Sequence, residues 1–118
     1  MNIQRGDVVM VQFPFAGSAS AKRRPGVVVQ NDRNNQRLDN VILAQVTSRL
    51  GPSNEPTRFV VDPQTADGAP SGLEHRSTIS CENLATVRKD QISEVVGHLC
   101  DTHIDQLDRC LKASLDLT

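Results

Sequence analysis

The sequence predicts a small α+β domain in which short strands form a curled, mostly antiparallel sheet and one helix closes the chain. Two observations predict this class. Short apolar runs rich in valine and isoleucine alternate with polar segments that contain glycine and proline, a pattern typical of strands and turns. Only the last segment carries apolar residues at clear helical spacing. Because 118 residues suffice to bury one core, we expect a single domain over residues 1–118.

The N-terminal half contains three runs of high β-propensity. They predict strands at residues 8–13, 26–30 and 41–46. Small and polar residues between the first two strands predict a loop at residues 16–21. The polar residues 31–40 predict a turn, which would make the second and third strands neighbours. Pro25 restricts Arg24 to extended backbone just before the second strand begins.

The C-terminal half predicts further strands and the closing helix. The expected strands lie at residues 57–61, 77–80 and 84–87. The apolar spacing of residues 92–99 fits a helix, and the same segment fits a strand, so periodicity leaves the two open. Thr102 and Asp105 resemble a capping box and predict a helix over residues 102–116. Its apolar stripe would be Ile104, Leu107, Leu111 and Leu115.

Composition limits the kinds of partner. The formal net charge is −1, so an anionic partner must be bound by a local patch, and the densest basic cluster is 22–24. The aromatic residues are three Phe, which predicts an aliphatic core. Three unpatterned cysteines without a signal peptide indicate a reducing cytoplasm. No apolar run is long enough to span a membrane.

Arg24 and Thr47 are the candidates for chemistry. The planar guanidinium of arginine matches a phosphate through two parallel hydrogen bonds, and Pro25 stiffens the backbone that presents it. The Thr47 hydroxyl, at the end of the third strand, can donate to a phosphoryl oxygen. Each also has an ordinary interpretation, as an exposed loop arginine and as a threonine chosen for β-propensity. Their expected position at one end of two neighbouring strands favours a shared ligand.

Histidine and cysteine do not predict a metal site. His98, Cys100 and His103 are close in sequence, but their spacing matches no zinc pattern with paired ligands. We expect a structural role for His98 and a surface position for His103 near the helix N-terminus. His75 lies in a polar loop where it could touch a ligand. The scattered acidic residues give no support to a paired-carboxylate hydrolase.

Several motifs together resemble a known family. In chain order they are Arg5-Gly6-Asp7-Val8, the Gly17-Ser18 loop, Arg24-Pro25, Val28-Val29-Gln30-Asn31-Asp32 and Val46-Thr47-Ser48. The later segments 76–80, 84–87 and 114–117 also fit, the first two as that family's central strands. Over almost its whole length the chain resembles the MazF/PemK/Kid toxins of bacterial toxin–antitoxin systems.

The resemblance implies an SH3-like barrel with a C-terminal helix that acts as a homodimer on single-stranded RNA. It implies a sequence-specific endoribonuclease with no metal or cofactor, in which a ribose 2′-OH attacks the adjacent phosphate. The products would be a cyclic phosphate and a free 5′-OH. Carried over, Arg24 matches the family's catalytic arginine and Thr47 its catalytic threonine.

The resemblance also implies binding residues and partners. The RNA contacts would be Ser18, Ser20, Lys22, Arg23, Glu82 and Asn83. The chain departs from many relatives at Ala19 and Ser20, which bears on the sequence it recognises. An antitoxin with an acidic, disordered tail would cover the RNA groove and anchor at the basic cluster. Operator DNA would be bound only together with that antitoxin.

Two other functions remain open on the same fold. The first is a CcdB-like toxin that poisons DNA gyrase through its C-terminal helix and is not an enzyme. The second is a non-catalytic nucleic-acid-binding module, such as an autoregulator. RNA cleavage by the purified protein separates the predicted enzyme from both.

Overall fold

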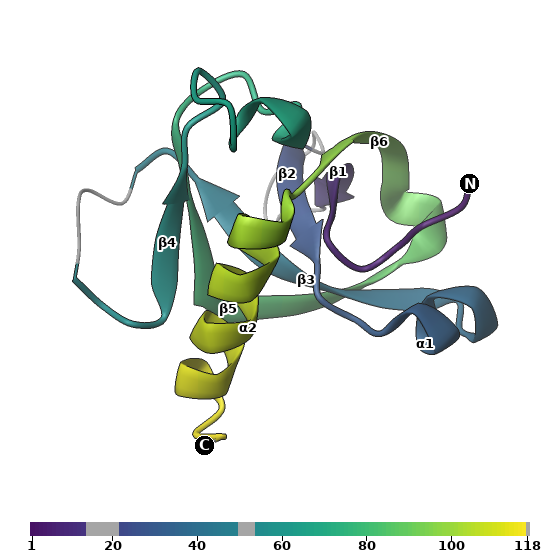
Figure 1. Cartoon of the computed structure of the whole chain (residues 1–118). Coiled ribbons are helices and arrows are strands. Elements are labelled where there is room, and N and C mark those ends of the chain that lie inside the picture. The colour runs from purple at the N-terminus through teal and green to yellow at the C-terminus, as the bar shows by residue number, and fades with distance from the viewer. Residues whose placement is uncertain (14–21, 50–53, 118) are drawn as a thin grey trace.

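Six strands form one antiparallel sheet in the computed structural model, which describes residues 1–13, 22–49 and 54–117, and the backbone alone for Phe13 and Lys22. The strands are β1 (Asp7–Phe13), β2 (Lys22–Val28), β3 (Asn40–Thr47), β4 (Arg58–Val61), β5 (Ser77–Arg88) and β6 (Ile92–His98). Their order across the sheet is β4-β5-β3-β2-β1-β6. The sheet curls without closing, and helix α2 (Asp101–Ser114) packs on β4 and β5, as Figure 1 shows. The predicted α+β class is thus confirmed.

A short helix stands where a turn was predicted. Helix α1 (Asp32–Arg37) begins after Asn31, whose side chain accepts a hydrogen bond from the Asn34 N–H at 2.8 Å. Inside it, the buried Asn35 accepts a hydrogen bond from the Gln30 side chain at 3.0 Å. The prediction of a turn over 31–40 was therefore wrong in detail, because a local cap and a buried amide pair stabilise a helix without an apolar stripe.

The predicted strands at residues 77–80 and 84–87 are one strand. In β5, Ser80 pairs with Gln45 of β3, and the next pair joins Leu84 to Ala44. Three residues, 81–83, therefore lie between consecutive pairs as a bulge, which we call the β5 bulge. A bulge bends a strand and redirects its side chains, so one continuous strand produces two separate apolar runs in the sequence.

Strand β2 begins earlier than the predicted start at Gly26. Its N-terminal part pairs only with β1, where Pro25 lies opposite Met10, and the ladder to β3 starts at Gly26. Proline is tolerated here because its missing N–H interrupts no hydrogen bond to β3. In the segment 92–99, for which a helix and a strand were both open, residues 92–98 form β6 and pair with β1.

The core is aliphatic, as predicted, and Phe59 is the one Phe, Tyr or Trp among the described residues of its hydrophobic clusters. Helix α2 contributes a face of His103, Leu107 and Cys110. His103 is only 7% exposed and its ring centroid lies 6.0 Å from that of Phe59, so the predicted surface position was wrong. The apolar ring face of histidine can pack in a core when a ring lies beside it.

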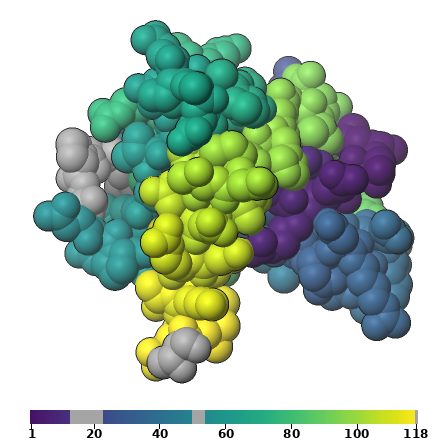
Figure 2. All heavy atoms as spheres, viewed as in Figure 1, coloured from purple at the N-terminus to yellow at the C-terminus, as the bar shows by residue number. Residues whose placement is uncertain are grey.

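Helix α2 also differs from the prediction at its two ends. Cys100 is the N-cap and makes no side-chain cap hydrogen bond, so the capping box predicted at Thr102 is absent. At the other end Leu115 follows the last helical turn and is 54% exposed. Figure 2 shows this end of the chain projecting from the body of the molecule.

None of the helices in the part of the chain that the structure describes has the length and apolar character needed to span a membrane.

Candidate functional site

Arg24 and Thr47 lie at the same end of β2 and β3 and line the same two pockets. The antiparallel register pairs Gly26 with Gln45, so Arg24 and Thr47 each lie two residues beyond this last pair, at the same end of the two strands. The first pocket has a volume of about 330 Å³, and the loop between Gly72 and Ser77 forms one wall; we call it the loop pocket. The second, of about 590 Å³, is lined by the β5 bulge and is called the bulge pocket. The predicted proximity of the two residues is confirmed.

Thr47 is oriented by the chain that follows it. Its Oγ1 accepts a hydrogen bond from the backbone N–H of Arg49 at 3.1 Å. Since the hydroxyl oxygen already accepts that bond, its hydrogen is available for donation into the pocket. Arg24 comes from the part of β2 that pairs with β1, opposite Val11, and its side chain is half-buried. A cation and a hydroxyl donor therefore converge from two rigid strands.

The loop wall is held against β6 by two glycines. Gly72 has φ of +69°, and a Cβ there would lie 2.0 Å from the Val96 carbonyl oxygen. A Cβ on Gly97 would lie 2.3 Å from the backbone of Ser71. The 3₁₀ turn η1 (Ala69–Ser71) therefore approaches β6 backbone to backbone, which only glycine permits. This contact places the loop residues Leu73 to His75 on the loop pocket.

The structure describes only part of the predicted basic cluster 22–24. Arg23 lines the loop pocket, where its guanidinium donates to Glu94 of β6 at 2.6 Å and to the Ser93 hydroxyl at 3.3 Å. The side chain of Lys22 and the predicted contacts Ser18 and Ser20 lie outside the described residues.

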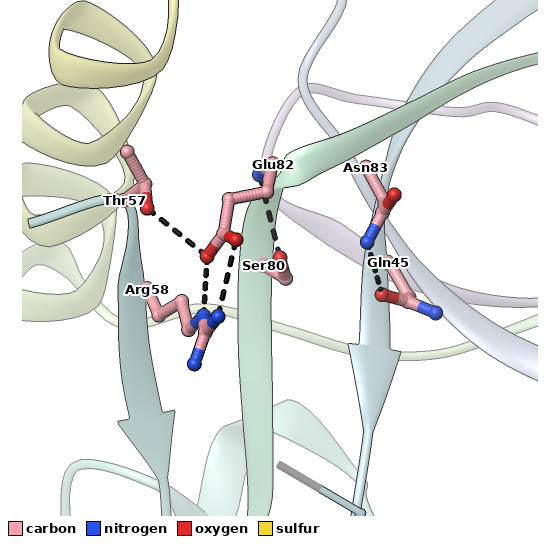
Figure 3. A network of polar contacts seen from close by, with 6 residues as sticks. All are labelled: Gln45, Thr57, Arg58, Ser80, Glu82 and Asn83. Carbon is pink, nitrogen blue, oxygen red and sulfur yellow. Dashed lines mark hydrogen bonds and ion pairs between the residues drawn. The ribbon is translucent and has the colours of Figure 1, made fainter. Parts of the chain in front are cut away.

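The β5 bulge places Glu82 and Asn83 on the bulge pocket, together with Arg24 and Thr47. Figure 3 shows Glu82 directed towards β4, where Arg58 and the Thr57 hydroxyl hydrogen-bond to its carboxylate. The hydrogen bond from Arg58 holds the pKa of the Glu82 carboxyl below its ordinary value. The carboxylate therefore stays ionised in neutral solution.

Asn83 points the opposite way, towards β3, as Figure 3 also shows. Its Nδ2 donates to Oε1 of Gln45 at 2.9 Å, and both side chains are exposed. The resulting amide pair presents further donors and acceptors to the bulge pocket. Sequence reasoning missed Gln45; the available signal was one polar residue in the otherwise apolar run of β3.

The histidines and cysteines are dispersed. Among the described residues, no three His, Cys, Asp or Glu side chains gather in a way that could hold a metal ion. His98 has the predicted structural position, with Nδ1 2.7 Å from the Asp7 carboxylate, which links β6 to β1. All three cysteines are free thiols, and burial raises the pKa of Cys81 to about 12.

Comparison with known proteins identifies the family. Residues 4–115 match the model of the PemK-like, MazF-like toxins of type II toxin–antitoxin systems. The endoribonuclease EndoA of Bacillus subtilis (strain 168) is 31% identical over 118 residues, which cover 99% of this chain and 97% of that protein. The chain belongs to the PemK/MazF toxin family, as its motifs predicted.

Solved structures share the fold. An endoribonuclease from a mycobacterial species, solved with its cognate antitoxin, superposes with a TM-score of 0.77 at 18% identity, over 98% of this chain and 97% of that one. The toxin MazF-mt6 of Mycobacterium tuberculosis gives 0.75 at 22% identity, over 95% and 98%. The MazE–MazF complex of Deinococcus radiodurans gives 0.76 at 15% identity, over 100% of both chains.

Proposed function

We propose that this protein is a sequence-specific endoribonuclease toxin that cleaves single-stranded RNA without a metal ion. The relative EndoA, similar over 99% of the chain, is an endoribonuclease. The observation that carries the proposal is the convergence of Arg24 and Thr47 on a pair of adjoining pockets. Phosphoryl transfer needs fixed donors around the phosphate, and these two side chains supply them from stiff strands.

In the proposed reaction the 2′-oxygen of one ribose bonds to the adjacent phosphorus while the bond from phosphorus to the 5′-oxygen breaks. The products are a cyclic phosphate and a free 5′-OH. Negative charge grows on the non-bridging oxygens, where the guanidinium of Arg24 stabilises it by two parallel hydrogen bonds. The Thr47 hydroxyl, oriented by Arg49, donates a third.

Recognition of the RNA sequence is assigned to the pocket walls. The proposed contacts are Ser18, Ser20, Lys22, Arg23, Glu82 and Asn83. To these we add Gln45, because its side chain is hydrogen-bonded to Asn83 on the bulge pocket. Single-stranded bases are read by hydrogen bonds to their edges once they leave the stack, and an exposed amide pair can make such bonds.

The proposed partners follow the family. We propose a homodimer that acts in the cytoplasm and is neutralised by an antitoxin whose acidic tail covers the RNA groove, with operator DNA bound only by the complex. Two related structures are toxin–antitoxin complexes. Reversing the charge of Lys22 and Arg23 should weaken inhibition by the antitoxin, and an unchanged affinity would contradict this anchoring.

One experiment tests the proposed activity. A long RNA is incubated with the purified protein in excess chelator, and the cleaved ends are mapped. We expect cuts at one short motif that leave cyclic phosphate and 5′-OH ends. Arg24→Ala and Thr47→Val should each slow cleavage by about 100-fold, the typical cost of losing one donor to a developing oxyanion.

The matched control is Arg88→Ala, which removes an exposed arginine that pairs with Asp90 away from both pockets. It should cleave at the wild-type rate. If the wild type cuts no RNA, the enzyme is excluded and a gyrase poison or a binding module takes its place. If the wild type cuts and Arg24→Ala cuts equally fast, the proposed site is wrong.

A further inference from the structure

The proposed cleavage needs a group that removes the proton from the 2′-OH, and neither proposed donor suits that task. The guanidinium of arginine stays protonated at all ordinary pH values and has no acceptor atom. The neutral Thr47 hydroxyl is a very weak base, and the proposed reaction uses its hydrogen as a donor. Another side chain of the same pocket is therefore the candidate proton acceptor.

The loop pocket contains one imidazole, that of His75. Among the described residues, the charged side chains that line the pocket with it are Arg23, Arg24, Arg49, Glu74 and Glu94. Glu94 is engaged by Arg23 at 2.6 Å. Imidazole is the side chain whose ordinary pKa lies nearest neutrality, so in its neutral form it accepts a proton efficiently.

The position of His75 is fixed by its backbone while its ring remains exposed. Its carbonyl oxygen accepts a hydrogen bond from the Ser77 hydroxyl at 2.8 Å, just before β5 begins. The ring makes no hydrogen bond or ion pair with any other described residue. Upstream, Gly72 anchors the same loop on β6. An exposed, ordered imidazole is thus held on the pocket that Arg24 and Thr47 share.

We propose that His75 is the general base of the cleavage reaction, an inference that rests on the proposed function. A neutral ring nitrogen takes the proton of the 2′-OH as the 2′-oxygen bonds to phosphorus. The bond to the 5′-oxygen breaks with its electron pair, and that oxygen takes a proton from water. The charge is balanced, because one imidazolium and one hydroxide form and then neutralise each other.

The test is the pH dependence of single-turnover cleavage in chelator, measured between about pH 5.5 and about pH 9. For the wild type we expect the rate to rise with pH along one limb and then level off. His75→Gln should lower the plateau by about 100-fold, the usual contribution of a general base, and remove that limb. Added imidazole should restore part of the activity of His75→Ala, more strongly as pH rises.

The affinity of His75→Gln for an RNA with 2′-deoxyribose at the cleaved nucleotide should differ from that of the wild type by less than about threefold, since a general base acts on the transition state. Arg76→Gln, next in sequence and outside both pockets, should behave as wild type.

Three results would overturn the role of His75. The first is a pH profile of His75→Gln that matches the wild type. The second is a wild-type cleavage rate that falls as pH rises. The third is that Glu74→Gln, and not His75→Gln, loses the rise of the rate with pH. A wild type that cleaves no RNA would refute the proposed function itself.

Discussion

The packing of Gly97 on η1 predicts that one added methyl group will impair the site from a distance. A Cβ at Gly97 would lie 2.3 Å from the Ser71 backbone and 2.4 Å from the Pro70 carbonyl oxygen, where ordinary contact begins at 3.4 Å. Backbone atoms cannot rotate away as a side chain can, so in Gly97→Ala the turn must withdraw by about 1 Å. The loop that carries His75 to the pocket begins at that turn.

The magnitude follows from this displacement. A misplacement of about 1 Å in an active site can cost about 100-fold in rate, so we expect Gly97→Ala to cleave RNA about 10- to 100-fold more slowly. Overpacking of this kind costs about 1–3 kcal/mol, which corresponds to a fall in Tm of roughly 4–12 °C for a domain of this size.

The assay combines single-turnover RNA cleavage with thermal unfolding, with rates measured well below the Tm of the variant. Val95→Ala is the matched control, because it lies in the same strand, is 37% exposed and only loses atoms. It should retain both the rate and the Tm. Wild-type values of both quantities in Gly97→Ala would show that the turn accommodates the methyl group and would refute the reasoning.

Two further predictions concern the bulge pocket and the core. Gln45→Ala or Asn83→Ala should reduce the preference for one base at one position of the cleaved sequence by about 10-fold, as measured from mapped RNA ends. Gln36→Ala on α1 should leave this preference unchanged. An unchanged motif in both variants would contradict base reading by the amide pair. Because burial raises the pKa of Cys81 from 9.0 to about 12, the folded state keeps a proton that the unfolded chain releases. The free energy of unfolding, measured by urea titration at each pH, should therefore fall as pH rises from 9.0 towards about 12. Cys81→Ala should make this fall with pH smaller, and an equal fall in the variant and the wild type would contradict the prediction.

Much of the fold could be predicted because local signals agreed with long-range pairing. Valine-rich runs predicted strands, and a polar connection of ten residues predicted that β2 and β3 are neighbours. That inference holds whether the connection is a turn or the helix α1. It sufficed to bring Arg24 and Thr47 together, because antiparallel neighbours place the start of one strand beside the end of the next.

The rest depended on interactions that the sequence does not display locally. The β5 bulge exists because residues on its two sides pair with consecutive positions of β3, which no pattern within β5 reveals. His103 is polar and stands in the first turn of a helix, so its burial beside Phe59 reflects tertiary packing alone. Gln45 became a candidate only when its bond to Asn83 was visible.

The pairing of β1 with β6 has a consequence for folding. Val8 pairs with Gly97, so the edge of β1 that faces β6 stays uncovered until residue 97 has been synthesised. Domains rich in such non-local pairs fold slowly, typically over milliseconds to seconds, because loop closure precedes the gain from contact. Glu94 and Val96 of β6 line the loop pocket. A nascent or truncated chain that lacks this strand would leave the edge of β1 unpaired and would lack one wall of the pocket, so we expect it to be prone to aggregation and unable to cleave RNA.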